Sequence, residues 1–148
     1  MRRTLLFVYG SLRRGLQNAY SIRLAREAAY LGAATMRGCL YRVASYPGMQ
    51  PDFHKRSIVS GDIYRLRHHS TLRWLDDYEG YVGSKPREFA RELHTARMPD
   101  GCPMQVWVYV YRRCTRRVQR LSSGDYLQEM YETSRTGHGP AGTRVRGN

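Results

Sequence analysis

A glutamate at the end of a predicted helix is the clearest candidate for proton transfer in this sequence. Leu72, Leu75 and Glu79 are separated by three and four residues, so a helix with about 3.6 residues per turn places them on one face. Asp77 falls on the opposite face. An apolar face removes water from a carboxylate, which raises its pKa toward the range that suits general acid/base catalysis. The competing interpretation is a frayed helix end, at which Glu79 faces water or caps a neighbouring amide.

The second candidate is the turn formed by Tyr9, Gly10, Ser11 and Leu12, which follows an apolar run. Gly10 permits a backbone turn that a Cβ atom would disfavour, and such a turn can direct successive N–H groups at one point. A concave set of N–H groups binds a carboxylate without any charged side chain. The same pattern is typical of a plain connection from a strand to a loop, so both interpretations remain open.

Basic residues outnumber acidic ones, with 25 Lys and Arg against 12 Asp and Glu and a formal net charge of +13. Five of the arginines fall within the nine residues from Arg112 to Arg120. Such a cluster is typical either of a nucleic-acid contact or of a solvated strand end and loop. Because no recognition motif accompanies it, we expect no specific nucleic-acid binding. The positive charge also suits an anionic substrate.

The cysteines and histidines indicate no metal centre. Cys39, Cys102 and Cys114 form no CxxC pair, and the five histidines have no HExxH spacing. We therefore expect neither a disulfide framework nor a metal site. No apolar run approaches the roughly 20 residues that cross a bilayer, and the short run Thr4–Tyr9 lacks the cleavage site of a signal peptide. The sequence predicts a cytoplasmic protein that does not bind membranes.

The predicted elements form one domain of the α+β class. The run Thr4–Tyr9 is continuously apolar, which suits a strand buried on both faces. Pro99-Asp-Gly101 supplies the turn of a hairpin. Strands are expected at residues 4–9, 35–43, 57–66, 88–98 and 103–112, with a turn at 46–48. Together they predict a small mixed, mainly antiparallel, β-barrel-like sheet with flanking helices.

Three helices are expected beside this sheet. Asn18 is suited to cap the first, which would extend to about Tyr30. Ile22, Ala25 and Ala29 lie at helical spacing and define its expected apolar face. The second covers residues 71–80, and a short third helix follows Asp125. From Thr133 onward the chain has almost no apolar residues, so we expect a domain at 1–132 and a disordered basic tail at 133–148.

Six short motifs occur in an order that is characteristic of one superfamily. In chain order they are Phe7-Val-Tyr-Gly-Ser-Leu-Arg-Arg-Gly15 with Asn18, Tyr46-Pro-Gly48, Gly61-Asp-Ile-Tyr-Arg-Leu66, Leu75-Asp-Asp-Tyr-Glu-Gly-Tyr81, Val106-Trp-Val-Tyr-Val-Tyr111 and Ser123-Gly-Asp-Tyr126. Together they cover the chain from Leu5 to about Tyr131. In this order and spacing the chain resembles the gamma-glutamylcyclotransferase-like superfamily, and within it the branch of small proteins that includes gamma-glutamylamine cyclotransferase.

The resemblance implies a small mixed barrel with flanking helices and a reaction that needs no metal or organic cofactor. A small gamma-glutamyl amine or peptide binds, its α-amine attacks its own side-chain amide carbonyl, and 5-oxoproline leaves with a free amine. By the same resemblance, the turn Tyr9–Leu12 holds the glutamyl head, and Glu79 carries the proton from the amine to the leaving nitrogen. The alternative is a non-catalytic module of this fold that binds a small molecule or anion.

One position departs from the family pattern. Many relatives have a tyrosine between the catalytic glutamate and an arginine on the following strand, whereas this chain has Phe89 before Arg91. The loop from Tyr81 to Glu88 is also longer than in the relatives. The missing hydroxyl group bears on substrate choice and on activity.

Overall fold

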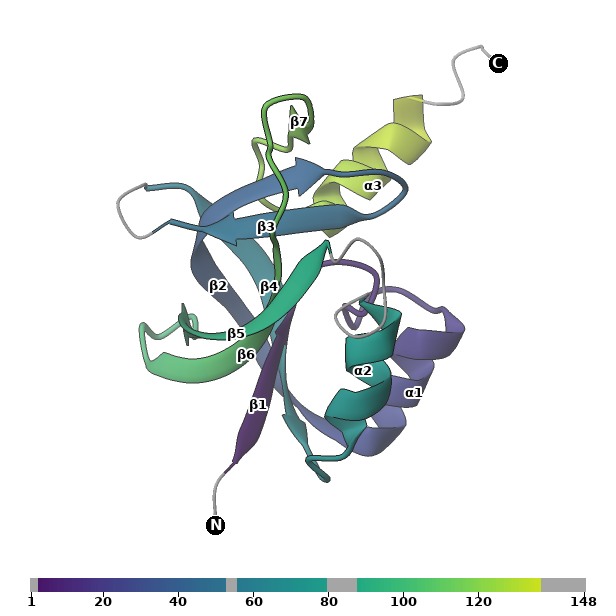
Figure 1. Cartoon of the computed structure of the whole chain (residues 1–148), viewed down its shortest axis with the longest axis vertical. Coiled ribbons are helices and arrows are strands. Elements are labelled where there is room, and N and C mark those ends of the chain that lie inside the picture. The colour runs from purple at the N-terminus through teal and green to yellow at the C-terminus, as the bar shows by residue number, and fades with distance from the viewer. Residues whose placement is uncertain (1–2, 53–55, 80–87, 137–148) are drawn as a thin grey trace.

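Seven strands and three helices make up the computed structural model, which describes residues 3–52, 56–79 and 88–136 (Figure 1). The strands are β1 (Thr4–Val8), β2 (Ala28–Arg42), β3 (Pro47–Pro51), β4 (Ile58–Leu66), β5 (Phe89–Arg97), β6 (Pro103–Tyr111) and β7 (Gln119–Arg120). The helices are α1 (Ala19–Glu27), α2 (Thr71–Tyr78) and α3 (Tyr126–Thr136). The predicted α+β class with a barrel-like sheet is confirmed.

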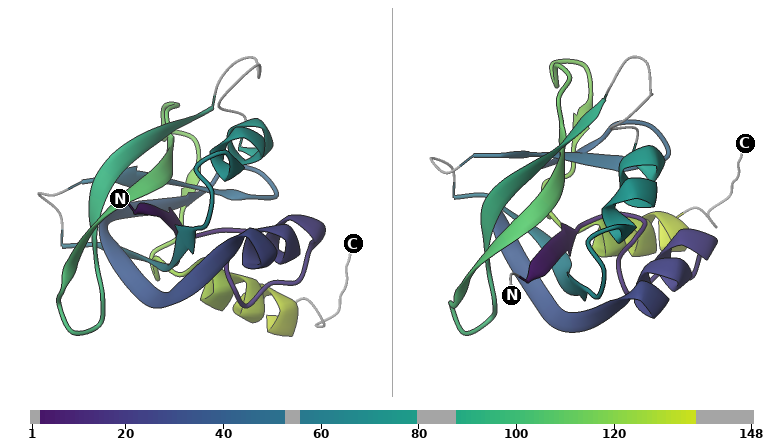
Figure 2. Two further views of the ribbon diagram at one scale, coloured as in Figure 1. Left: turned by 90° about the horizontal axis from the view of Figure 1, so that it is seen from below. Right: turned by 60° about the horizontal axis from the view of Figure 1, so that its bottom comes forward.

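Five of the strands close into a small mixed barrel. Hydrogen bonding follows the order β2-β4-β1-β6-β5, and the residue pair Thr35 and Arg97 joins β5 back to β2. β1 runs parallel to β6, whereas the other pairings in the barrel are antiparallel. β2 is 15 residues long and bends around the barrel (Figure 2). A register shift between Tyr30 and Gly32 lies within this strand, and such an irregularity allows the bend.

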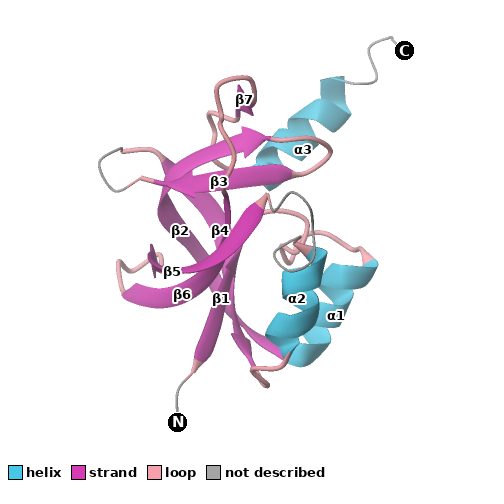
Figure 3. Ribbon diagram, in the orientation of Figure 1, coloured by secondary structure: helices cyan, strands magenta, loops and turns pink. Residues whose placement is uncertain are grey.

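Both faces of β1 are buried, as its continuous apolar run predicted. Phe7 and Tyr9 belong to the core inside the barrel. Leu6 and Val8 belong to the core between the barrel and the helices α1 and α2. Leu75 of α2 has no exposed surface in this second core. Figure 3 shows the two helices against one side of the barrel, so β1 connects the two cores and leads directly to the turn that follows it.

Helix α1 begins where the sequence predicted and ends sooner. Asn18 caps it and forms a capping box with Ser21, which satisfies amides of the first turn. The helix ends at Glu27 because the following residues pair with β4 as part of β2. The predicted core face was wrong, because Ile22 is 45% exposed and Leu24 is fully buried.

The segment predicted as a turn at 46–48 is largely a strand. Pro47 begins β3, which pairs with the end of β2, so the sequence analysis missed one strand. Proline is tolerated at the first residue of a strand, where its missing N–H costs little. Gly48 is required by packing, because a Cβ atom there would lie 2.8 Å from the Cβ atom of Tyr111.

Helix α3 follows Asp125 as predicted and continues to Thr136. It therefore extends four residues beyond the domain boundary predicted at 132. Residues 137–148 of the predicted tail, and Gly80 at the predicted end of α2, lie outside the described residues. Within the described ranges, no helix is both long and apolar enough to span a membrane.

Candidate active site

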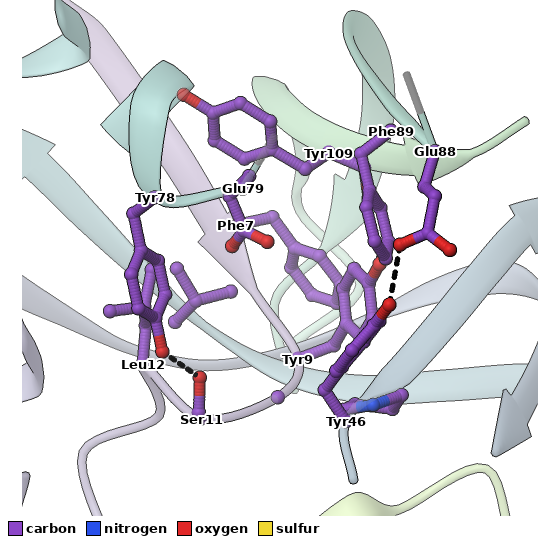
Figure 4. Close-up of a pocket in the computed structure, with 13 residues that line it drawn as sticks. Phe7, Tyr9, Ser11, Leu12, Tyr46, Tyr78, Glu79, Glu88, Phe89 and Tyr109 are labelled. Carbon is purple, nitrogen blue, oxygen red and sulfur yellow. Dashed lines mark hydrogen bonds between the residues drawn. The ribbon is translucent and has the colours of Figure 1, made fainter. Parts of the chain in front are cut away.

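A pocket of about 270 Å³ opens where the end of α2 meets the turn after β1 (Figure 4). This volume suits a small molecule rather than a folded partner. The lining residues are Phe7, Val8, Tyr9, Gly10, Ser11, Leu12, Tyr46, Pro47, Tyr78, Glu79, Glu88, Phe89 and Tyr109. The structure thus brings Glu79 together with all four residues of the predicted turn.

Helix α2 determines the position of Glu79. Leu72 and Leu75 are 3% and 0% exposed and define the buried face of the helix, whereas Asp77 is exposed. The N–H group of Glu79 donates to the carbonyl oxygen of Leu75 at 2.9 Å, so the residue belongs to the last turn. Its side chain retains some accessible surface and lines the pocket. The predicted common face of the two leucines and the glutamate is confirmed.

In residues 3–52, 56–79 and 88–136, the Glu79 carboxylate finds no partner that would offset its loss of hydration. Burial raises its pKa from the usual 4.5 to about 7. Among the described residues, no hydrogen bond or ion pair reaches this carboxylate. A carboxyl group with a pKa near neutrality can both accept and donate a proton at physiological pH. The alternative of a solvated, frayed helix end does not match this environment.

Three tyrosine side chains line the pocket together with the Glu79 carboxylate. Burial is the main cause of a raised pKa in Tyr9, Tyr78 and Tyr109, and the negative charge of Glu79 adds to it. All three phenols therefore stay protonated at neutral pH. The Tyr9 hydroxyl donates to the carbonyl oxygen of Tyr109 at 2.7 Å, and the Tyr109 hydroxyl donates to Asp76 at 2.6 Å. These hydrogen bonds hold the side chains of Tyr9 and Tyr109 in place in the pocket lining.

The turn after β1 is held by side chains from two helices. The Asn18 side-chain amide donates to the carbonyl oxygen of Ser11 at 2.8 Å. The hydroxyl groups of Ser11 and Tyr78 share a hydrogen bond of 2.6 Å (Figure 4). In the described part of the chain, the backbone N–H groups of Gly10, Ser11 and Leu12 donate to no protein acceptor. Their hydrogen-bonding capacity is therefore available to a ligand.

Gly10 is required for a reason that differs from the one predicted. It is not among the glycines with a positive φ, so the turn does not depend on a left-handed residue here. A Cβ atom at this position would lie 2.8 Å from the Cγ atom of Pro47. The close approach between the turn and the start of β3 therefore excludes larger residues. A Cβ atom is thus disfavoured at Gly10, as predicted, but the cause is this contact and not a left-handed backbone conformation.

An ion pair at the end of α2 was not predicted. Asp76 accepts hydrogen bonds from Nε of Arg91 at 2.9 Å and from Nη2 at 3.1 Å. The Tyr109 hydroxyl donates to the same carboxylate. This two-point contact holds the last turn of α2 against β5 and β6 and thereby orients the residue that follows it. Asp76 lies four residues after Leu72, so helical spacing could have indicated that it is buried.

A second buried ion pair anchors the turn from the other side. Arg13 is 7% exposed and contacts Asp62 at 3.3 Å and Asp125 at 3.0 Å. Asp62 also accepts a hydrogen bond from the N–H group of Arg14 at 2.9 Å. These bonds tie the turn to β4 and to the residue before α3. The acidic partners lie 49 and 112 positions from Arg13, a distance at which the sequence gives no signal of pairing.

Phe89, the position at which the sequence departs from the expected pattern, forms part of the pocket wall. The side chain is 5% exposed. Its ring packs against Tyr46 and Tyr111, with ring centroids 6.0 and 5.6 Å away. The wall is therefore apolar at this position.

No arginine is among the described residues that line the pocket. Its charged lining residues are two carboxylates, Glu79 and Glu88. The five arginines between Arg112 and Arg120 are exposed, as expected of a solvated strand end and loop. A search of the described residues finds no group of three His, Cys, Asp or Glu that could hold a metal ion.

The closed barrel and its pocket define the class to which the protein belongs. Among the described residues, no partner reaches the carboxylate at the end of α2, and the N–H groups of Gly10, Ser11 and Leu12 have no protein acceptor. The sequence model of the family described as "Gamma-glutamyl cyclotransferase, AIG2-like" matches residues 6–128. The chain belongs to this family.

Relatives and solved structures agree with this assignment. The gamma-glutamylcyclotransferase family protein YtfP of Escherichia coli K12 is 33% identical over 123 residues, which cover 82% of this chain and 95% of the relative. The solution structure of YtfP superposes with a TM-score of 0.61 at 30% identity, over 86% of this chain and 99% of that one. An AIG2-like protein from mouse gives a TM-score of 0.59 at 26% identity, over 74% of this chain and 78% of that one.

One relative is named for a particular substrate. The gamma-L-glutamyl-butirosin B gamma-glutamyl cyclotransferase of Niallia circulans is 29% identical over 113 residues. The matched segment covers 73% of this chain and 67% of that protein.

Proposed function

We propose that the protein is a gamma-glutamyl cyclotransferase that releases 5-oxoproline from a small gamma-glutamyl amine or peptide. The observation that carries the proposal is Glu79, a buried carboxyl group with a pKa of about 7 and no partner in the described part of the chain. Its pocket also contains the turn whose amides have no acceptor among the described residues. Family membership and the relative named for action on gamma-L-glutamyl-butirosin B support the reaction type.

The proposed reaction exchanges one C–N bond for another within a single substrate molecule. The α-amine nitrogen attacks the carbon of the gamma-amide carbonyl, a five-membered lactam closes, and the bond to the leaving nitrogen breaks. One proton passes from the attacking nitrogen to the leaving nitrogen, and no water is consumed. Because the nucleophile and the electrophile belong to one molecule, the enzyme has to hold a folded conformer and move one proton. No step requires electron transfer.

Glu79 is the group that moves this proton. With a pKa of about 7, about half of the carboxyl groups are ionised at neutral pH. The ionised form takes the proton from the attacking nitrogen, and the protonated form returns it to the leaving nitrogen. General acid/base catalysis of this kind contributes about 10² to 10⁴ in rate.

The turn after β1 receives the glutamyl head. Its α-carboxylate accepts hydrogen bonds from the N–H groups of Gly10, Ser11 and Leu12, which have no acceptor among the described residues. A set of backbone N–H groups binds an anion without a charged side chain. Tyr78 directly precedes Glu79 in the chain, and its hydroxyl group is hydrogen-bonded to Ser11 of the turn. The bound glutamyl head would therefore lie next to the proton-transfer group.

The test is to incubate the protein with a panel of gamma-glutamyl amines and dipeptides in ¹⁸O-labelled water. Mass spectrometry then measures 5-oxoproline and glutamate. We expect unlabelled 5-oxoproline, because its oxygen atoms all come from the substrate. Labelled glutamate would instead show hydrolysis by water. Ligand binding without any product would favour a non-catalytic binding module of the same fold.

A further inference from the structure

The hydroxyl groups of the pocket differ in whether their hydrogen atoms are already used. Each hydroxyl group carries one hydrogen atom that it can donate. Tyr9 donates to the carbonyl oxygen of Tyr109, and the Tyr109 hydroxyl donates to Asp76. The Tyr46 hydroxyl donates to the carboxylate of Glu88 (Figure 4). These three hydrogen atoms are therefore committed to acceptors within the protein.

Ser11 and Tyr78 supply the remaining hydroxyl groups in the described part of the pocket lining. Their oxygen atoms lie 2.6 Å apart and share one hydrogen bond. Burial is the main cause of the raised pKa of Tyr78, so the phenol stays protonated at neutral pH and the pair keeps both of its hydrogen atoms. One of them forms the shared bond. The other has no acceptor in residues 3–52, 56–79 and 88–136, so it is available to a ligand.

The surroundings of the pair indicate that this available hydrogen atom belongs to Ser11. A phenol is more acidic than an aliphatic alcohol, so Tyr78 is the better donor and Ser11 receives the shared bond. The Tyr78 ring packs against Tyr20 with 4.2 Å between the ring centroids, and the backbone of Ser11 is held by the side chain of Asn18. An accepted hydrogen bond polarises a hydroxyl group, which makes Ser11 a stronger donor toward the pocket.

The proposed reaction needs a donor of this kind. Attack by the α-amine places negative charge on the oxygen atom of the gamma-amide carbonyl. The described lining of the pocket has no basic side chain, and the N–H groups of the turn bind the α-carboxylate in the proposed complex. Figure 4 shows Ser11 and Tyr78 on the side of the pocket that also holds Glu79. A fixed donor at a developing oxyanion stabilises the transition state more than the bound substrate.

We propose that the Ser11 hydroxyl group, oriented by Tyr78, donates a hydrogen bond to the gamma-amide carbonyl oxygen and stabilises the negative charge that develops there. This inference rests on the proposed function. As the amine nitrogen attacks, an electron pair of the C=O bond moves to the oxygen atom, and it returns when the bond to the leaving nitrogen breaks. Ser11 keeps its proton throughout, and Glu79 moves the proton between the nitrogens. Ser11 is thus a catalytic residue, and Tyr78 is a positioning residue that acts through it.

The first test measures kcat and KM for 5-oxoproline release from the panel of gamma-glutamyl amines and dipeptides. Ser11→Ala removes the donor, so kcat should fall about 10²-fold while KM changes little. Tyr78→Phe keeps the stacked ring and removes the hydroxyl group that orients Ser11, so kcat should fall about tenfold. Tyr20→Phe is the matched control, because this tyrosine is 46% exposed and is not among the lining residues, and it should match the wild type.

The second test detects the hydrogen bond without turnover. Infrared spectroscopy compares gamma-glutamyl-butylamide, labelled with ¹³C at its gamma-carbonyl, when it is bound to Glu79→Gln and to Glu79→Gln/Ser11→Ala. The carbonyl band should lie at lower frequency in Glu79→Gln, because a hydrogen bond to the oxygen atom weakens the C=O bond. Equal frequencies would overturn the inference. A raised KM with unchanged kcat in Ser11→Ala would also overturn it, because the hydroxyl group would then bind the glutamyl head.

Failure of the inference and failure of the proposed function give different results. Release of 5-oxoproline that does not depend on Ser11 would refute the inference and retain the function. A carbonyl band that depends on Ser11, without release of 5-oxoproline by the wild type, would retain the contact and refute the function.

Discussion

Replacing Glu79 by glutamine is expected to change how the stability of the fold depends on pH. Glu79→Gln keeps the size and hydrogen-bonding ability of the side chain and removes the titrating group. Burial raises the pKa of Glu79 from its usual 4.5 to about 7 in the folded chain, whereas the unfolded chain keeps the usual value. Between these two values the folded chain binds the proton more tightly than the unfolded chain does.

The free energy of unfolding of the wild type should therefore fall as pH rises through this window. Below the usual value of 4.5 the carboxyl group is protonated in both states, and its full stabilising contribution is present. Above the folded pKa of about 7, that contribution is lost. A pKa difference of this size corresponds to about 3 kcal/mol, and water in the pocket reduces it to about 2 kcal/mol. Glutamine does not titrate, so the variant does not suffer this loss.

Urea unfolding at several pH values between about 4.5 and about 8 measures the effect. The stability of Glu79→Gln relative to the wild type should increase by about 2 to 3 kcal/mol across this range. Asp77→Asn, on the exposed face of the same helix, is the control and should show no such increase. A difference between Glu79→Gln and the wild type that stays constant with pH would refute the reasoning, because Glu79 would then titrate as a solvated carboxylate.

Three further substitutions test other parts of the site. Asp76→Ala removes the two-point contact with Arg91 and the acceptor of the buried Tyr109 hydroxyl group, so the free energy of unfolding in urea should fall by about 3 kcal/mol; a loss of a few tenths would show that the pair does not hold α2. Gly10→Ala places a Cβ atom 2.8 Å from Cγ of Pro47, so calorimetry should show about tenfold weaker binding of a gamma-glutamyl ligand, and unchanged affinity would exclude the turn from the site. Phe89→Tyr should alter the ratio of kcat/KM between substrates, whereas a shifted pH profile would assign the hydroxyl group to proton transfer instead.

Local sequence signals were sufficient for much of the fold. The continuous apolar run of β1 predicted a strand buried on both faces, and Pro99-Asp-Gly101 predicted the hairpin of β5 and β6. The end of α1 was predicted wrongly because alanine favours helices, whereas pairing with β4 makes residues 28–30 part of β2. β3 was missed because Pro47-Gly48 favours a turn in isolation. Pairing with the distant strand β4 determined the first outcome, whereas pairing with the neighbouring end of β2 determined the second.

The residues of the site also differ in what determines their position, which is local spacing for some and contacts distant in sequence for others. Glu79 was predictable because its spacing from two buried leucines is a property of one helix. The Arg13 ion pairs were not, because both acidic partners are distant in sequence. The contact between Tyr46 and Glu88 joins residues 42 positions apart, and it lies on a wall that only the folded chain assembles. Residues that hold the parts of the pocket together therefore emerged from the structure, whereas the proton-transfer candidate emerged from the sequence.

In the proposed reaction, Glu79 transfers the proton during gamma-glutamyl cyclisation. The most direct test is the rate of 5-oxoproline release as a function of pH for the wild type, Glu79→Gln and Asp77→Asn. We predict that wild-type kcat/KM rises with pH through an apparent pKa near 7, in line with the raised pKa of Glu79. Glu79→Gln, shown to be folded and to bind ligand, should lose about 10² to 10⁴ in rate, and Asp77→Asn should match the wild type. Unimpaired turnover by Glu79→Gln would contradict the mechanism.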